Sequence, residues 1–385
     1  MSKSLFASPR AVMNLEDCSF YHTVDIPGYG TIPGFWDIRG NESHYLGDVT
    51  FTGKRVLEIG PASGHLSFFI ESQNAEVISI EAAEDYTWEF FWDSYAAVPA
   101  GLEEMLRVHR EHMERLRNSY WFCHRALASK AKVHYGSAYS VPRELGRFDV
   151  SVLACVLLHT KSPVRIIENC ARITDEKIII VEPFRERQFA QVPAEFLPKD
   201  DREGWDTWWG FSPKFFVDLL RSMGFTHSKV TFHTQTCFGQ PADLFTVVAN
   251  RTAFDETPIS EAVFNVAISS PVDRLRIQVG RLTNLPLNVV NLADTPISSF
   301  SASPVLMSYH WKRKSGEVAV WDGIRTFLPR VLHKGDSDDI FLAVRAPEDP
   351  GDYLLEVSIL EEGRAWYDDL VGGIPIRIET VVTNA

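Results

Sequence analysis

The chain has 385 residues, of which 45% are hydrophobic and 23% are charged, as is ordinary for a globular protein. This length exceeds that of a usual single core, so two domains are expected. The net charge of −13 disfavours a nucleic-acid partner, because nucleic-acid binding normally requires a cationic surface. Residues 1–20 contain no signal-peptide core, and the longest uncharged apolar run, residues 150–158, is too short to span a bilayer. We therefore expect a cytoplasmic protein without a membrane span.

The five cysteines argue against a disulfide framework and against a structural zinc site. Their number is odd and no two of them form a C-x-x-C pair, so we expect reduced, buried thiols. His109 and His112 have a spacing that occurs in metal sites, but they lie in a highly charged segment without a third ligand nearby. A solvated helix face is the expected role of these histidines, and no metal is predicted.

The first half of the chain alternates apolar runs with amphipathic stretches, which predicts a mostly parallel α/β sheet. We expect an N-terminal cap segment over residues 1–52, followed by a cofactor-binding domain over residues 53–255. The predicted strands of this domain are residues 55–59, 76–80, 132–135, 148–153, 177–182, 228–233 and 244–250.

The first of these strands leads into a glycine-containing turn, which is the most informative part of the sequence. Glu58 lies within the strand, and Gly60 and Gly64 allow a tight turn into the following helix and a close approach of a ligand. Glu81 ends the second strand, where α/β folds bind ribose hydroxyls. The spacing E-x-G-x-x-x-G lacks the G-x-G-x-x-G pattern of dinucleotide loops. An ordinary strand-to-helix turn is the alternative.

The segment between the second and third strands, residues 82–132, is unusually long. Residues 84–95 are rich in aromatic side chains, and residues 101–127 have helical spacing with many charges. An insertion of this length is expected to form either a lid or substrate wall, or a helical pair packed on the sheet edge.

The composition changes near residue 255. Residues 256–260 are expected to form a linker, and short alternating apolar runs separated by turn residues follow it. These runs predict an immunoglobulin-like β-sandwich over residues 260–385. The expected strands are residues 275–279, 287–291, 305–311, 318–321, 340–344, 353–360 and 374–379.

The first domain resembles the class I methyltransferases, which bind S-adenosylmethionine (SAM), and in particular the group related to the enzyme that modifies the wobble uridine of tRNA. The resemblance covers roughly residues 20–250 and implies a Rossmann-like fold. It rests on residues 20–25 (FYHTVD), 33–37 (PGFWD), 53–60 (GKRVLEIG), 118–121 (NSYW), 135–139 (YGSAY), 148–150 (FDV), 157–159 (LLH) and 208–213 (WWGFSP).

The resemblance and the chemistry of the residues together imply a set of cofactor contacts. Glu58 is expected to orient the loop or to reach the methionine amino group, and Glu81 to accept both ribose hydroxyls. Where relatives place an acidic residue beside the adenine, this chain has Ser137 and Ala138. The full set of expected cofactor-binding residues is Glu58, Gly60, Pro61, Gly64, Glu81, Ala82, Ser137, Ala138 and Ala154.

Methyl transfer to a hydroxyl or a protonated amine needs a base, and His159 is the expected candidate, because it follows the fourth strand. The alternative for His159 is a packing role at a helix start. His22 is a second catalytic candidate, and Trp36 is a candidate for substrate binding; both alternatively anchor the N-terminal segment. Trp208 and Trp209 are expected to line the acceptor site or to belong to the core.

The second domain resembles the sandwich modules at the ends of bacterial polysaccharide-processing enzymes and exporters, on the basis of residues 308–311, 347–353 and 361–367. The preferred hypothesis is a SAM-dependent methyltransferase acting on an oxygen or nitrogen of a small molecule, sugar or glycolipid. The sandwich would then present the acceptor or mediate homodimer formation. The alternatives are a tRNA-modifying carboxymethyltransferase and a catalytically idle glycan-binding protein.

Overall fold

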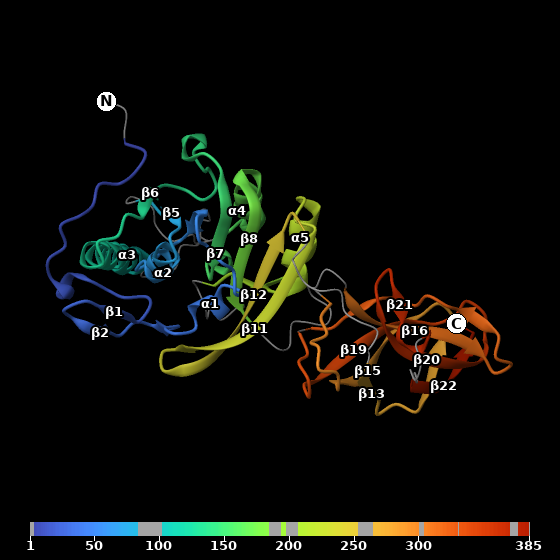
Figure 1. Ribbon diagram of the computed structural model, residues 1–385. Coiled ribbons are helices and arrows are strands. Elements are labelled where there is room, and N and C mark those ends of the chain that lie inside the picture. Colours follow the sequence, from blue (N-terminus) through green and yellow to red (C-terminus); the bar gives the residue numbers. More distant parts are fainter. Residues whose placement is uncertain are drawn as a thin grey trace. The chain divides into compact units, whose positions relative to one another are not determined.

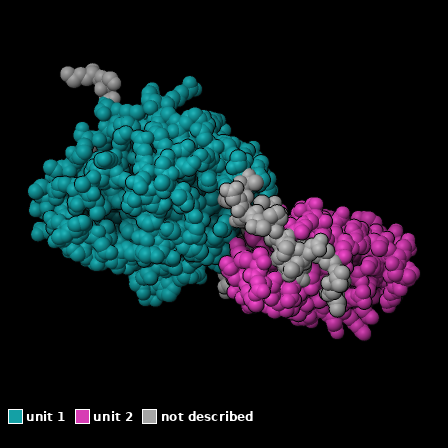
Figure 2. Space-filling model, viewed as in Figure 1, with its two compact units in different colours: residues 1–253 teal, residues 254–385 magenta. Residues whose placement is uncertain are grey.

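The computed structural model describes residues 4–83, 102–184, 194–197, 207–252, 265–299, 304–329, 331–369 and 376–384. The chain divides into two units, residues 1–253 and residues 254–385, which Figure 2 colours teal and magenta. Each unit is described by itself.

An eight-stranded sheet forms the centre of the first unit, with the strand order β3-β11-β12-β8-β7-β4-β5-β6 (Figure 1). The strands from β8 to β6 in this order are parallel, whereas β12 is antiparallel to both β8 and β11. All seven predicted strands are confirmed, some with longer ends. The bounds are β3 Trp36–Asp37, β4 Arg55–Ile59, β5 Glu76–Glu81, β6 Lys132–Tyr135, β7 Phe148–Ala154, β8 Thr174–Pro183, β11 His227–Cys237 and β12 Gln240–Asn250.

Helices cover this sheet, which explains why its central strands are apolar along almost their whole length. In β8 the run Ile178, Ile179, Ile180 and Val181 is completely buried. Helix α2 packs against β5, α4 against β8 and α5 against β12 (Figure 1). Ser212 caps α5 by accepting a hydrogen bond from the Phe215 amide. The helices are α1 Glu42–Tyr45, α2 His65–Ser72, α3 Leu102–Ala126, α4 Pro163–Ile173 and α5 Pro213–Ser222.

Helix α3 lies in the long segment 82–132 and belongs to the connection between β5 and β6. Because β5 and β6 are adjacent and parallel, the chain must cross over between them, and α3 is part of that crossover. Its residues Tyr120, Trp121 and Phe122 are buried against Phe68 of α2 and Val133 of β6. The helix is therefore part of the core of the first unit. The aromatic-rich residues 84–95 lie outside the described residues.

The strand order reverses at β4, which determines where a ligand is expected. From β4 the chain proceeds outward to β5 and β6, and then returns to the other side of β4 to form β7 and β8. In open α/β sheets, ligands bind beyond the carboxyl ends of the strands at such a switch point. The carboxyl ends of β4 and β7 are Ile59 and Ala154.

The N-terminal segment contains short strands that the sequence analysis did not predict, because two or three residues carry no readable alternation. Strands β1 (Val24–Ile26) and β2 (Gly30–Ile32) form a hairpin, and β3 pairs with the end of β11. A bridge between His22 and Trp36 precedes β3, with hydrogen bonds from the Thr23 amide to Trp36 O and from the Trp36 amide to Tyr21 O. These contacts fix residues 21–23 at the edge of the sheet.

The second unit consists of β-strands in two sheets, with the orders β13-β15-β19 and β14-β22-β20-β16-β17; β18 and β21 pair with β16 and β20. The seven predicted strands are confirmed, and β13, β18 and β21 are additional. One core cluster contains residues of both sheets, so the two sheets pack face to face. The bounds are β13 Val266–Ser269, β14 Arg274–Gln278, β15 Leu282–Asn291, β16 Val305–Arg313, β17 Val318–Val320, β18 Thr326–Phe327, β19 Ser337–Arg345, β20 Gly351–Glu361, β21 Ala365–Trp366 and β22 Ile376–Thr383.

Two tryptophans of the second unit are expected to respond differently to substitution. Trp311 is completely buried and its Nε1 donates to Arg345 O at 2.8 Å, whereas Trp321 is 41% exposed. Trp311→Phe removes this hydrogen bond and leaves a cavity, so we expect a loss of about 2 kcal/mol in the free energy of unfolding. Trp321→Phe is the matched control, with an expected change below about 0.5 kcal/mol. Urea denaturation of both variants tests this, and equal losses would contradict it.

Candidate active site

The turn between β4 and α2 has the strained geometry that its glycines predict. Gly60, Ala62 and Gly64 have φ values of 73°, 50° and 86°, and Gly64 is the N-cap of α2. The Gly60 amide donates to Ile80 O at 2.9 Å, and the Gly64 amide donates to Pro61 O at 2.7 Å. A non-glycine residue such as Ala62 rarely adopts a positive φ, and such strain occurs mainly at functional sites.

Glu81 lies beside this turn and holds it. Its Oε2 accepts a hydrogen bond from the Ala62 amide at 3.3 Å, and its Oε1 accepts one from the Ala82 amide at 2.7 Å. Burial raises the pKa of the Glu81 carboxyl. Arg117 of α3 opposes that shift and donates to Ala82 O at 3.1 Å. Glu81, at the end of β5, therefore contacts the glycine turn that follows β4.

Glu58 is directed into the protein below the turn. Its Oε2 accepts hydrogen bonds from the hydroxyls of Ser67 on α2 and, at 3.0 Å, of Ser79 on β5. Burial raises the pKa of the Glu58 carboxyl to about 7. Of the two expected roles of Glu58, these contacts favour orientation of the loop, because they join α2 to the neighbouring strand.

The two N-terminal candidates lie next to the turn. The His22 amide donates to Ser63 Oγ at 3.3 Å, and the His22 ring lies 5.5 Å from the ring of His65. Burial, with a smaller effect of His65, lowers the pKa of His22 to about 3, so this imidazole is neutral near pH 7. Within the described part of the chain, its buried Nδ1 has no hydrogen-bond partner. The indole of Trp36 is partly exposed and hydrogen-bonds to the hydroxyl of Tyr21.

Ser137 and Ala138 follow β6 on the other side of Glu81. The Gly136 amide donates to Glu81 O at 2.8 Å, which fixes the start of this loop beside β5. Ser137 is exposed, and its Oγ accepts from the Tyr139 amide at 3.2 Å. The carbonyl of Ala138 accepts from Asn169 Nδ2 at 3.2 Å. The loop therefore has a fixed backbone and an accessible serine.

The end of β7 brings His159 and the tryptophan pair together. A short 3-10 helix, η4 (Leu157–His159), follows β7, and His159 is partly exposed. The Trp208 amide donates to Leu158 O, and Trp209 Nε1 donates to Thr160 O, both at 2.8 Å. Trp208 is only 1% exposed, so its ring belongs mainly to the core, whereas Trp209 is partly accessible.

The sequence analysis missed Glu182, which lies near the carboxyl end of β8. Its Oε1 accepts from the Leu157 amide at 3.1 Å, and the nearby Leu158 amide lowers the pKa of the carboxyl. Its Oε2 is buried and has no hydrogen-bond partner among the described residues. Burial raises the pKa of Glu182 to about 8. The signal that identified Glu58 and Glu81, an acid near the end of an apolar strand, applies equally to Glu182.

Two buried carboxyls, Glu58 and Glu182, give the stability of the first unit a predictable pH dependence. Both titrate at 4.5 when unperturbed, and burial raises their pKa values to about 7 and about 8 in the folded protein. Their contribution to stability is therefore fully present below about pH 4.5 and is lost as the pH rises through the folded values. Burial lowers the pKa values of His22 and His233, but that opposite contribution is complete above about pH 6.5.

We therefore expect the stability of the first unit to fall between about pH 6.5 and about pH 8, by up to about 1.4 kcal/mol per pH unit for each carboxyl. Glu182→Gln should reduce this slope, because the amide does not titrate. Thermal unfolding followed by helical ellipticity measures the slope, since the described α-helices all lie in the first unit. Identical slopes in both proteins would show that Glu182 titrates at an ordinary pKa.

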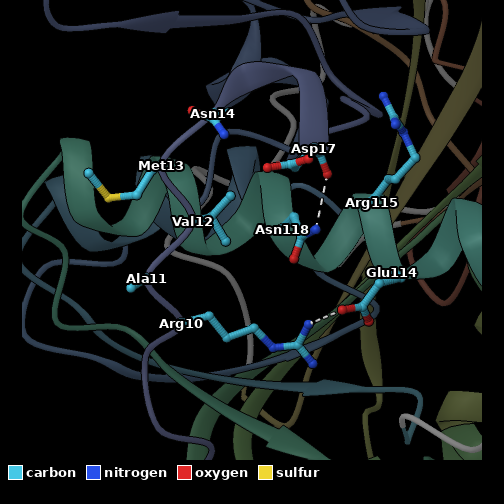
Figure 3. Close-up of a pocket in the computed structure, with 9 residues that line it drawn as sticks. All are labelled: Arg10, Ala11, Val12, Met13, Asn14, Asp17, Glu114, Arg115 and Asn118. Carbon is cyan, nitrogen blue, oxygen red and sulfur yellow. Dashed lines mark hydrogen bonds and ion pairs between the residues drawn. The ribbon is translucent and has the colours of Figure 1, made fainter.

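A separate surface pocket of about 530 Å³ lies between the N-terminal segment and α3 (Figure 3). Arg10 forms an ion pair with Glu114 at 2.6 Å, and Asn118 Nδ2 donates to Asp17 O at 3.0 Å across it. None of the expected site residues lines this pocket. Its lining residues are Arg10, Ala11, Val12, Met13, Asn14, Asp17, Glu114, Arg115 and Asn118.

No cluster of three or more His, Cys, Asp and Glu side chains in the described ranges is arranged to hold a metal ion. Among those same residues, no helix combines the length and the apolar character needed to cross a membrane.

The sheet order, the switch point and the glycine turn define the first unit as a Rossmann-like α/β domain. No family model and no curated protein matches the chain. Among solved structures, the N-terminal domain of EvdMO1 with SAH bound is 16% identical over 61% of this chain and 92% of its own, with a TM-score of 0.37. The magnesium protoporphyrin IX methyltransferase ChlM from Synechocystis PCC 6803 with bound SAM is 13% identical over 55% of this chain and 76% of its own, with a TM-score of 0.34.

A third neighbour is the 1,6-didemethyltoxoflavin-N1-methyltransferase from Burkholderia thailandensis with bound 1,6-didemethyltoxoflavin and S-adenosylhomocysteine. It is 12% identical over 55% of this chain and 77% of its own, with a TM-score of 0.34. The second and third neighbours are named as methyltransferases, and what the three proteins bind is a property of those proteins.

Proposed function

We propose that this chain is a SAM-dependent methyltransferase that acts on an oxygen or nitrogen of a small molecule, sugar or glycolipid. The observation that carries the proposal is the hydrogen bond from the Ala62 amide to Glu81 Oε2, because it joins the strained glycine turn to an acidic strand end beside the switch point. The residues proposed to form the cofactor site are Glu58, which orients its loop, with Gly60, Pro61, Gly64, Glu81, Ala82, Ser137, Ala138 and Ala154.

The described residues fit SAM in shape and in charge. Gly60 is partly accessible, and a Cβ added there would lie 3.1 Å from Val156 Cγ2, so the turn has little room for a side chain where a ligand approaches. Glu81 offers a carboxylate to the ribose hydroxyls, and charged acceptors form the stronger hydrogen bonds. Bound SAM supplies a methyl group already activated by its sulfonium. The protein then mainly has to align the acceptor with that group.

The finer parts of the proposal concern organisation and acceptor. Residues 1–52 would act as a cap of the methyltransferase domain, residues 53–255, and residues 260–385 would form an immunoglobulin-like sandwich that presents the acceptor or mediates homodimer formation. We propose a cytoplasmic enzyme related to the tRNA wobble-uridine group in its first domain. Its net charge of −13 favours a small-molecule or glycan acceptor over tRNA.

Calorimetric titration of the full chain with SAM and, separately, with S-adenosylhomocysteine tests the proposed cofactor. Micromolar binding of both is the expected result. It would justify a screen in which labelled SAM is incubated with hydroxyl-bearing and amine-bearing sugars and metabolites. Failure of both compounds to bind would remove the methyltransferase proposal and leave an idle domain as the better hypothesis.

His159→Ala is expected to lower turnover while leaving the affinity for SAM nearly unchanged. The physical reason is its place in η4 beside Trp209, beyond β7 and on the side of the site away from Glu81. A side chain that positions the acceptor against the methyl group acts on turnover, and a misplacement of about 1 Å costs about a hundredfold in rate. His333→Ala is the control, since His333 is an exposed residue of the second unit. Equal turnover of the two variants would assign His159 a structural role.

A further inference from the structure

A group of titratable side chains lies beyond the ends of β7 and β8, next to the proposed cofactor site. Strand pairing aligns Ile59 of β4 with Leu153 of β7, and Leu153 with Ile180 of β8. Adjacent strands are about 4.8 Å apart, so the end of β8 lies about 10 Å from the glycine turn. Glu182 follows Ile180 by two residues. Its carboxyl is therefore placed on the far side of the cofactor site from Glu81, where an acceptor would sit.

The two oxygens of the Glu182 carboxyl have different surroundings. Oε1 accepts from the Leu157 amide at 3.1 Å and so holds the start of η4, whereas Oε2 is buried without a partner among the described residues. A buried oxygen without a hydrogen bond costs about 1 to 3 kcal/mol, so such an atom needs an explanation. Holding η4 explains only Oε1. A group that arrives with the acceptor would explain Oε2.

The other titratable groups near Glu182 have higher pKa values than its carboxyl. The hydroxyls of Tyr21 and Tyr45 and the thiol of Cys155 all have pKa values raised, first by burial and further by nearby groups that include Glu182. Cys237 of β11 lies near Tyr21 and Cys155, and burial raises the pKa of its thiol. Near neutral pH, Glu182 is the member of this group that exchanges a proton.

The backbone at Cys155 strengthens the functional interpretation. Cys155 has φ +50°, its amide donates to Val181 O at 2.8 Å, and its Sγ lies 3.7 Å from the hydroxyl of Tyr45. Cys155 is also partly accessible. A strained, accessible residue between the cofactor turn and Glu182 marks this side of the sheet as the place of the reaction.

We infer that Glu182 is the catalytic base of the enzyme and that the acceptor is a hydroxyl group, which donates its proton to Glu182 Oε2 as it is methylated. The inference rests on the proposed methyltransferase function. In the step, the C–O bond forms as the C–S bond of SAM breaks, the electron pair of that bond passes to sulfur, and the hydroxyl proton passes to the carboxylate. The products are the methyl ether, neutral S-adenosylhomocysteine and the protonated carboxyl.

The competing explanation is that Glu182 only caps η4. Glu182→Gln separates the two, because its amide oxygen can still accept from the backbone while its nitrogen cannot take a proton. A cooperative thermal unfolding transition at about pH 6.5, with a midpoint no lower than that of the wild type, would show that the variant keeps its fold. Any loss of function in that variant would then result from the missing proton acceptor at the position of Oε2.

The first test needs no acceptor, because a carboxylate near the sulfonium attracts SAM but not uncharged S-adenosylhomocysteine. Both compounds are titrated at about pH 6.5 and about pH 9, on either side of the titration of Glu182. In the wild type, we expect the ratio of the S-adenosylhomocysteine Kd to the SAM Kd to rise about tenfold with pH. Groups whose titration changes the affinity for both compounds equally have no effect on this ratio.

In Glu182→Gln this rise should largely disappear, leaving the contribution of Glu58, whose pKa is about 7. Glu76→Gln, which changes an exposed carboxylate at the other end of β5, is measured as the control and should keep the rise. A wild-type rise that persists unchanged in Glu182→Gln would overturn the inference while leaving SAM binding, and hence the proposed function, intact. Absence of SAM binding in the wild type would instead remove the proposed function and the inference with it.

The second test uses the labelled-SAM screen. We expect hydroxyl compounds to be methylated, and turnover of the first such compound to fall about a hundredfold or more in Glu182→Gln with KM little changed. The rate of the wild type should rise with pH through the titration of Glu182. A screen in which only amines accept the methyl group would overturn the hydroxyl assignment, as would equal turnover of the variant.

Discussion

Gly64→Ala is expected to abolish SAM binding and to lower the free energy of unfolding of the first unit by about 3 kcal/mol. Gly64 has φ +86°, and a Cβ added there would lie 2.5 Å from Phe68 Cε2 and 2.7 Å from Tyr120 Cδ2. Both rings belong to the same core cluster, and Tyr120 is only 2% exposed, so neither ring is free to move away. The added methyl group would displace α2 and, with it, the cofactor turn.

Gly53→Ala is the matched control for this substitution. Gly53 has φ +72° but nothing within 4 Å of an added Cβ, so it has the backbone strain without the clash. We expect Gly53→Ala to cost about 1 kcal/mol and to leave SAM binding intact. Urea denaturation followed by helical ellipticity, together with SAM calorimetry, measures both effects. Equal losses in the two variants would show that the rings of Phe68 and Tyr120 yield easily.

Glu81→Ala should weaken SAM binding by tenfold or more, because it removes the carboxylate proposed to accept both ribose hydroxyls. Hydrogen bonds to a charged group are worth about 1.5 to 3 kcal/mol each. The variant also loses the hydrogen bond from the Ala62 amide to Glu81 Oε2, so the turn becomes less fixed. Calorimetry with SAM and with S-adenosylhomocysteine should show a loss for both, since both carry the ribose.

The control for Glu81→Ala is Glu76→Ala, at the opposite end of the same strand. Glu76 is exposed and pairs with Lys132 at 3.0 Å and with Arg55 at 3.1 Å. Exposed ion pairs contribute at most about 1 kcal/mol, so we expect a small change in stability and none in SAM affinity. Unchanged SAM affinity in Glu81→Ala would sink the proposed ribose contact.

The N-terminal segment contributes more to the candidate site than its composition indicates. Tyr21 and His22 lie beside the cofactor turn because the backbone around Thr23 pairs with Trp36, which itself belongs to the edge of the main sheet. The Ser63 hydroxyl, within the turn, accepts from the His22 amide. Substitutions in residues 21–23 are therefore interpretable only together with the geometry of the turn.

The sequence by itself determined the main strands of both units and the position of the glycine turn. A strand buried on both faces must be apolar along its length, so β4, β7 and β8 are readable as runs of Val, Ile and Leu. The glycines at 60 and 64 are readable because a tight strand-to-helix turn needs positive φ. Strands of two or three residues, such as β3, carry no such periodicity and were missed.

Only the tertiary structure decided which polar residues meet. Tyr21, Tyr45, Cys155 and Glu182 come from distant parts of the chain, and the sheet order brings them to one edge. The same folding removes them from water, and desolvation is what raises the pKa of Glu182 to about 8. Local sequence determines the conformation of the backbone, whereas the environment of a side chain depends on segments that are remote in the sequence. The position of Glu182 near the end of an apolar strand is readable in the sequence, whereas its burial and its neighbours are determined by the fold.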